Sequence, residues 1–216
     1  MTDMTDKTDN TDKIAAIVAE EWRQFQLVRN EGGRASCQDD WPEFNRQRSA
    51  QFRAWSEELR DSYYQDLRDA AAQGRNLLTE KYAWMMAETA PERFAELRPF
   101  LPEPGAEQRA LIEEIVELHL RWAADFAADF PLYAGSGRPL RAAEAPAGVT
   151  AVETYLRGEL CTYSPATLRL YRDYAADCQR RGINLTRLIR DDTARALGLD
   201  GSVGAEAFLR RKYGRD

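Results

Sequence analysis

A loop with two adjacent glycines carries the densest set of reactive side chains in this sequence. Residues 30–40 read NEGGRASCQDD and lie between two helical patterns. Gly32 and Gly33 allow a sharp turn that can aim successive backbone N–H groups into one concavity. Arg34 can bind a carboxylate or phosphate through its planar guanidinium, and Cys37 is a candidate nucleophile if a positive charge favours its thiolate. The loop therefore predicts an anion site with Arg34 as its main charge partner.

The same loop also fits a structural role. Arg34 would then pair with a neighbouring carboxylate, and Cys37 would be a small buried apolar group. Asp39 and Asp40 could attract a hard cation, which prefers oxygen ligands. However, Pro42 is typical of a first helical turn, so we assign both aspartates to helix capping and to the helix dipole, and we predict no metal site.

A helical pattern that follows Gly74 supplies further candidates. Asn76 and Glu80 are four residues apart, so their side chains should project together from one helix face. Glu80 is a candidate catalytic acid or base, and Tyr82 or Lys81 is a candidate donor that would tune it. The alternative interpretation leaves Glu80 and Lys81 in solvent and places Tyr82 in the core.

The segment ETYLRGELCTYS, which begins at Glu153, is unusually polar for a helix with buried leucines. Glu153 and Arg157 have the spacing of a helical ion pair, which by itself is a surface feature. A cavity wall is the second interpretation. It makes Glu153 a candidate proton carrier, and Tyr155, Arg157 and Glu159 candidate ligand-binding residues.

A long helix should begin near Trp41 and continue to about Ala70, with polar residues interrupting its aromatic stripe. Arg48 and Gln51 are two of these interruptions. Because buried polar groups need partners, the helix either lies at an edge or lines a wet cavity, in which Arg48 and Gln51 would bind a ligand. The single histidine, His119, lies on an apolar stripe and is expected to be a hydrogen-bonded core residue; a haem ligand or a general base is the alternative.

The remaining pattern is helical throughout, because apolar residues recur every three or four positions and no segment alternates with period two. We expect an all-α, single-domain bundle of about seven or eight helices over residues 13–216, preceded by a disordered Thr-Asp tail over residues 1–12. Thr150 and Glu153 fit a capping box, and Ser164-Pro165 should open another helix. Residues 131–148, rich in glycine and proline, should form one long loop that borders the site.

Composition excludes several classes of protein. The formal net charge is −6 over 216 residues, and the arginines are scattered among carboxylates. A nucleic-acid binder needs a concentrated basic face, so none is expected. No apolar run approaches the ~20 residues that cross a bilayer, and the N-terminus lacks a signal-peptide profile. The three cysteines are widely spaced without a CxxC pair, which disfavours a disulfide framework or structural zinc. We expect a cytoplasmic protein.

Several blocks, taken in order, resemble a known family. They read EEWRQFQLVRNEGGRASCQDDW, RSAQFRAWSEELRDSYYQDL, GRNLLTEKYAWMMAETAPE and VETYLRGELCTYSPATLRLY. Together they are similar to the bacterial domain-of-unknown-function family numbered 4125, over nearly all of residues 20–171. The resemblance implies a single domain and no particular activity.

Our first hypothesis is a helical enzyme that acts by acid/base chemistry on an anionic or amino-acid-like metabolite. Arg34 and Arg157 would hold the ligand, and Glu80 or Glu153 would move protons, around one cavity shared by the Gly32 loop, Glu80 and residues 153–159. The alternatives are a non-catalytic interaction or regulatory module and a haem- or metal-dependent enzyme. The sequence identifies no cofactor, predicts neither a nucleic-acid nor a membrane partner, and leaves a homo-oligomer open.

Overall fold

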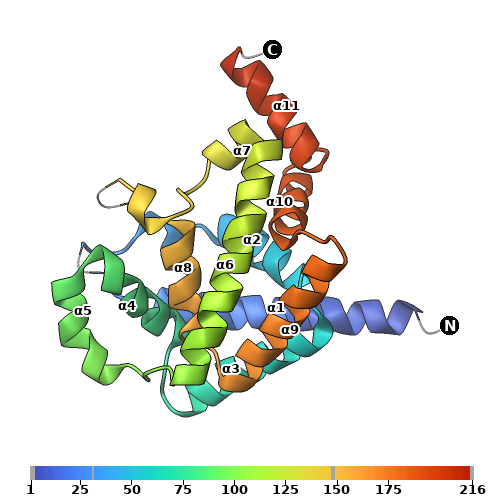
Figure 1. The fold of residues 1–216 in the computed structure, drawn as a ribbon. Coiled ribbons are helices and arrows are strands. Elements are labelled where there is room, and N and C mark those ends of the chain that lie inside the picture. The colour runs from blue at the N-terminus through green and yellow to red at the C-terminus, as the bar shows by residue number, and fades with distance from the viewer. Residues whose placement is uncertain (1–2, 31, 147–148, 215–216) are drawn as a thin grey trace.

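The computed structural model describes residues 3–30, 32–146 and 149–214, and all regular structure in these ranges is helical. Eleven α-helices and three short 3-10 helices follow one another in this part of the chain, with no strand (Figure 1). The all-α prediction is confirmed. The number of α-helices is eleven rather than the seven or eight expected.

The helices have the following bounds: α1 Asp3–Gln26, α2 Trp41–Arg53, α3 Glu57–Ala72, α4 Leu77–Thr89, α5 Pro91–Leu97, α6 Ala106–Asp129, α7 Pro131–Gly135, α8 Val152–Leu160, α9 Pro165–Arg180, α10 Leu185–Ala196 and α11 Gly201–Tyr213. The 3-10 helices are Ser36–Asp39, Arg98–Phe100 and Ala142–Glu144.

The long helix α6 lies at the centre of the arrangement and packs against α7, α8, α9 and α10 (Figure 1). Helix α4 makes its most extensive contact with α8, and α1 lies against α2, α3 and α4. The main apolar cluster includes Ile17, Leu59, Ile115 and Leu168, all fully buried, and a smaller cluster holds Phe25, Val28 and Leu78. Helix α11 contacts only α10 and α7 extensively and projects away from the rest.

Side-chain caps explain where several helices begin. Asp40, Ser56, Asn76 and Ser164 each accept a hydrogen bond from the backbone N–H three residues further along. Such caps satisfy N–H groups that have no partner inside the helix. The predicted starts of α2 after Asp40 and of α9 after Ser164 are confirmed.

The predicted long helix from Trp41 is wrong, because the chain turns between Arg53 and Glu57 and forms α2 and α3. Ser56 caps α3, and the buried Arg60 guanidinium donates to the carbonyls of Phe52 and Trp55, at 3.0 and 2.5 Å. Arg60 therefore ties the first turn of α3 to the end of α2 and to the turn that follows it.

Three further expectations need correction. Helix α7 and a 3-10 helix occupy part of the expected loop over residues 131–148, of which residues 147–148 lie outside the described ranges. No capping box opens α8, since its N-cap is Ala151 and the Glu153 carboxylate instead accepts from the Ala142 N–H at 3.0 Å. Helix α1 begins at Asp3, within the segment expected to be a disordered tail.

Candidate functional site

Four charged side chains from four helices meet in the interior. Glu21 of α1, Arg48 of α2, Lys81 of α4 and Glu159 of α8 are 0%, 6%, 2% and 4% exposed. We call this set the buried charge network. It contains two carboxylates and two cations, so its formal charges cancel. Buried ions of this kind are tolerated only when they are paired and hydrogen-bonded.

Arg48 links the two carboxylates of the network. Its Nε and Nη2 donate to Glu21 at 2.6 and 2.5 Å, and its Nη1 and Nη2 donate to Glu159 at 3.3 and 3.1 Å. The Tyr63 hydroxyl adds a third hydrogen bond to Glu21, at 2.6 Å. The guanidinium thus ties α1, α2 and α8 together with charge-assisted hydrogen bonds, which are stronger than neutral ones.

Glu159 is the most heavily bonded group. Its Oε1 accepts from Arg48, Gln51 and Tyr163, and its Oε2 accepts from Arg48 and Lys81. Five donors exceed the roughly four lone-pair sites of a carboxylate, so Glu159 has no acceptor position left.

The same contacts fix the ionisation of Glu159. Burial alone would raise the pKa of its carboxyl, but Arg48 and Lys81 outweigh burial and hold that pKa well below its usual range. Burial raises the pKa of Tyr63 and of Tyr163 well above the usual tyrosine value. At neutral pH the carboxyl is therefore ionised and both hydroxyls are protonated.

A cavity of about 210 Å³ borders the network at Glu159, and we call it the Glu159 cavity. Gln51, Tyr155 and Glu159 line it, and the Tyr155 ring centroid lies 3.5 Å from the Lys81 ammonium. The lining comes from α2, α6, α7, α8, α9, α10 and the segment before α8; its members are Gln51, His119, Ala123, Phe126, Ala134, Arg138, Leu140, Val152, Tyr155, Leu156, Glu159, Tyr171, Thr186, Ile189 and Arg190.

His119 and Tyr171 form a neutral pair at this cavity. The Tyr171 hydroxyl and His119 Nε2 are 3.0 Å apart, and both side chains are buried. Burial lowers the pKa of His119 to about 4 against a smaller opposing effect of Glu159, and burial raises the pKa of Tyr171. The expectation of a hydrogen-bonded core histidine is confirmed. The pair is uncharged at neutral pH.

Two arginines that line the cavity are more exposed than His119 and Glu159, which also line it. Arg138 is exposed and Arg190 half-buried, whereas His119 and Glu159 are buried. The Arg138 guanidinium donates to the Thr150 carbonyl at 3.2 Å, and that of Arg190 lies 5.3 Å from the Tyr133 ring centroid. Within the described ranges, no carboxylate lies at ion-pair distance from either guanidinium.

Glycine helps to place one of these arginines. At Gly137 an added Cβ would lie 2.8 Å from Arg190 Nη2. The missing side chain therefore lets the guanidinium approach the backbone of the segment before α8. Arg138 and Leu140 of the same segment line the cavity, as does Ala134 of α7. The prediction for residues 131–148 concerned a site shared with the Gly32 loop, which does not line this cavity.

The Gly32 loop is held by hydrogen bonds to its own residues and to the end of α1. Gln38 is 1% exposed, and its amide donates to the carbonyls of Phe25 and Val28 at 2.8 and 3.0 Å. Arg34 bonds Asp39 at 2.9 Å, the Gln38 carbonyl at 2.8 Å and the Gln26 side chain. This matches the structural alternative for Arg34. Cys37, in contrast, is exposed rather than buried.

Residues at the start of α4 also have local partners. Glu80 forms a two-pronged ion pair with Arg75, at 2.8 and 2.7 Å. Asn76 caps α4 and donates to the Gln24 carbonyl at 2.9 Å, so it does not project beside Glu80 as expected. Tyr82 lies in an aromatic cluster with Phe25, and burial raises its pKa.

Glu153 and Arg157 belong to an ion-pair network on the outer part of α8. Arg157 bonds Glu113 at 3.0 Å, Glu88 at 2.8 Å and Glu153 at 3.2 Å. The expected Glu153–Arg157 pair is thus confirmed. The partners of Arg157 differ entirely from those of Arg34.

The prediction of one cavity shared by the Gly32 loop, Glu80 and residues 153–159 is corrected by this geometry. Of those candidates, only Tyr155 and Glu159 line the Glu159 cavity, together with Gln51 from α2. Arg48 does not line the cavity itself, but it donates to two residues that do, Glu159 and Gln51.

Other members of the site were not among the sequence candidates: Glu21, Tyr63, Arg138, Tyr163, Tyr171 and Arg190. Lys81 was a candidate only as a partner of Glu80, whereas it pairs with Glu159 at 2.5 Å. Glu21 had a usable signal, because it interrupts the apolar stripe of Ile17, Val18 and Phe25. Arg138 and Arg190 lie on exposed or half-buried positions that look like ordinary surface arginines.

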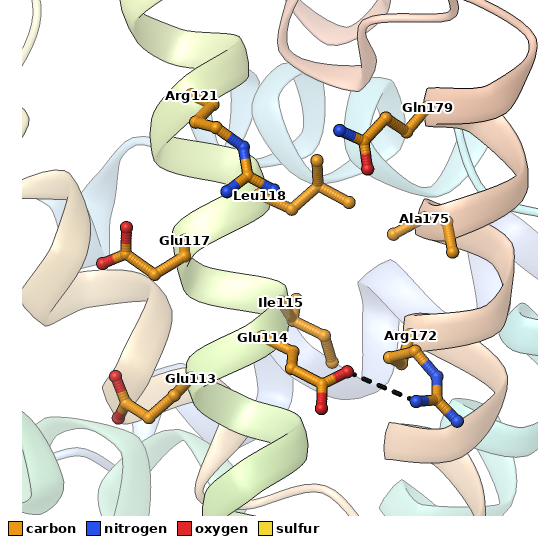
Figure 2. Close-up of a pocket in the computed structure, with 10 residues that line it drawn as sticks. Glu113, Glu114, Ile115, Glu117, Leu118, Arg121, Arg172, Ala175 and Gln179 are labelled. Atoms are coloured by element: carbon orange, nitrogen blue, oxygen red, sulfur yellow. Dashed lines mark hydrogen bonds and ion pairs between the residues drawn. The ribbon is translucent and has the colours of Figure 1, made fainter.

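A second, larger depression of about 450 Å³ lies between α6 and α9 (Figure 2). Its carboxylates already have partners: Glu114 bonds Arg172 at 3.3 Å, Glu117 bonds Arg141 at 2.7 Å, and Glu113 bonds Arg157. Exposed pairs of this kind are screened by solvent. We therefore place the candidate site at the Glu159 cavity, where polar groups are buried.

The DUF4125 profile, described as a protein of unknown function, matches residues 11–207. The chain belongs to the DUF4125 family. The matched range contains the buried charge network and every residue of the Glu159 cavity. Neither the curated proteins nor the solved structures provide a match.

None of the helices formed by the described residues has the length and apolar character needed to cross a membrane. The described residues also contain no group of three or more His, Cys, Asp or Glu side chains arranged to hold a metal ion.

Proposed function

We propose that this DUF4125 protein binds a small organic anion in the Glu159 cavity. The observation that carries the proposal is the pair Arg138 and Arg190, which border a cavity with buried polar groups and have no carboxylate partner among the described residues. Arginine guanidinium groups bind carboxylates and phosphates through paired hydrogen bonds.

The size and lining of the cavity set the class of ligand. Its volume of about 210 Å³ is below the ~300–1,000 Å³ of sites for drug-sized molecules. Phe126, Val152 and Ile189 add apolar surface to the lining. A metabolite with one anionic group and a short apolar body fits these features.

Ligand binding is favoured over the acid/base enzyme that the sequence suggested. An efficient proton carrier has a pKa near the working pH. Here Glu159 has a pKa well below its usual range, His119 has a pKa of about 4, and Tyr171 has a raised pKa. Each group therefore keeps one protonation state near neutrality, which suits recognition.

The alternatives from the sequence find less support. A non-catalytic interaction module would have a solid core, whereas this core contains a cavity beside a buried charge network. For the haem alternative, His119 Nε2 would be the iron ligand, but it is engaged by the Tyr171 hydroxyl.

A thermal-shift panel of small carboxylates and phosphate esters tests the proposal. At about 100 times its Kd, a ligand should stabilise the protein by about 2.7 kcal/mol, or roughly 5–11 °C for a chain of this length. Ala134→Phe, which fills the cavity, should abolish the shift. Ala128→Phe, at an exposed position on α6, should not. Equal shifts in both variants, or no shift with any anion, would contradict the proposal.

A further inference from the structure

We infer that the ligand of the Glu159 cavity carries, besides its anionic group, a neutral hydroxyl or carbonyl group that meets the His119–Tyr171 pair. The ligand class is then a small hydroxy- or oxo-acid rather than an amino acid. This inference rests on the proposed function and specifies the substrate class of the same site.

The first step concerns Glu159, the carboxylate that would attract an ammonium group. Its two oxygens already accept from Arg48, Gln51, Lys81 and Tyr163. Because those donors occupy all its acceptor positions, a ligand ammonium could bind Glu159 only by displacing a buried donor. Displacement would leave that donor without a partner, which is costly in the interior.

The second step concerns charge. Glu21 and Glu159 are balanced by Arg48 and Lys81, so the network offers no net negative charge. Arg138 and Arg190 add two positive charges at the same cavity. A ligand cation would therefore meet an environment of net positive charge, whereas an anion with a neutral second group would not be repelled.

The third step concerns what the His119–Tyr171 pair can bind. One of the two tautomers of His119 lets the Tyr171 hydroxyl donate to Nε2, and the tyrosine oxygen can then accept from a ligand hydroxyl. In the other tautomer, Nε2–H donates to the tyrosine oxygen and the hydroxyl can donate to a ligand carbonyl or hydroxyl. Both groups line the cavity, so the pair can match either neutral group.

Calorimetric titration with matched acids tests the inference on the full chain. One set is benzoate, para-hydroxybenzoate and para-aminomethylbenzoate; the other is butanoate with its omega-hydroxy and omega-amino derivatives. Within at least one set, the hydroxy acid should bind about tenfold more tightly than the unsubstituted acid, a difference of about 1.4 kcal/mol. The amino derivative should bind more weakly than both.

Two variants assign the effect to the pair. Tyr171→Phe should remove the advantage of the hydroxy acid over the unsubstituted acid, and measurable binding of the unsubstituted acid shows that the variant folds. Tyr174→Phe is the matched control on α9, because its hydroxyl bonds the Ala54 carbonyl and does not line the cavity. It should leave both affinities unchanged.

The outcomes separate the two proposals. If hydroxy and unsubstituted acids bind equally, or if the amino derivative binds most tightly, the inference about the second group is overturned and the anion site stands. If the hydroxy advantage survives in Tyr171→Phe, the assignment to the pair is overturned. If no acid in either set binds, the inference about this ligand class is overturned, and the wider anion panel decides the proposed function separately.

Discussion

Replacing Arg48 by methionine should be among the most damaging single changes in this protein. Arg48 is 6% exposed and makes four hydrogen bonds to carboxylate oxygens, two to Glu21 and two to Glu159. Without it, Glu159 would keep Lys81 as its cation, and Glu21 would keep only the Tyr63 hydroxyl. Removing one partner of a buried ion pair costs about 3–5 kcal/mol. That is a large part of the ~5–15 kcal/mol by which proteins are stable.

The assay is urea unfolding followed by far-ultraviolet circular dichroism. Arg53→Met is the control, since Arg53 lies on the same helix but forms an exposed pair with Asp192, for which about 0–1 kcal/mol is expected. The double variant Glu21→Gln with Arg48→Met restores neutral charge. It should be more stable than Arg48→Met alone by at least about 1 kcal/mol, the scale of coupling between residues in contact.

Two results would refute this reasoning. A loss below about 1 kcal/mol in Arg48→Met, with an unchanged dependence on urea, would show that the network contributes little. A double variant less stable than the single one would show that charge balance is not the cause of the loss.

Three further predictions follow from other contacts. Burial lowers the pKa of His119 to about 4 from 6.5, so the contribution of neutral His119 to the free energy of unfolding is fully present above pH 6.5 and is lost as the pH falls toward 4, at up to about 1.4 kcal/mol per pH unit. The free energy of unfolding measured against pH should lose this slope in His119→Gln. An unchanged slope in that variant would contradict the assignment. Gly158→Ala should cost about 1–3 kcal/mol, because its Cβ would lie 2.6 Å from Met85 Cγ and 2.9 Å from the Lys81 carbonyl; Gly135→Ala, with nothing within 4 Å, is the control, and equal melting temperatures would refute the close packing of α4 and α8. Gln38→Ala should speed hydrogen exchange in the Gly32 loop and lower the free energy of unfolding by about 1–3 kcal/mol, whereas Cys37→Ser should do neither. A larger effect of Cys37→Ser than of Gln38→Ala would contradict the assignment of Gln38 as the residue that holds the loop.

The fold was predictable where caps and periodicity agree. Asp40 and Ser164 mark helix starts by residue type, and both predictions hold. The break at Ser56 was hidden because Phe52, Trp55 and Leu59 keep a spacing of three and four residues across it. All three residues are buried, with Phe52 before the turn and Leu59 after it, so the apolar pattern continues although the helix does not.

The site was predictable only in part. Arg48 and Gln51 on an aromatic stripe, with Tyr155 and Glu159 on a polar helix, indicated buried partners, and these residues do meet. Which partners they would find was not readable, since Arg48 and Glu159 are 111 residues apart. Arg34 and Glu80 looked equally promising, but each is satisfied by a residue five positions away, Asp39 and Arg75.

The most direct test of anion binding at the Glu159 cavity is the calorimetric Kd of the tightest-binding acid for the Arg138→Gln, Arg190→Gln double variant. Charge-assisted hydrogen bonds are worth about 1.5–3 kcal/mol, so we expect the Kd to rise at least tenfold. The matched variant Arg68→Gln, Arg211→Gln removes two exposed arginines elsewhere and should leave the Kd unchanged. An unchanged Kd in the first variant, or an equal loss in both, would contradict the anion site.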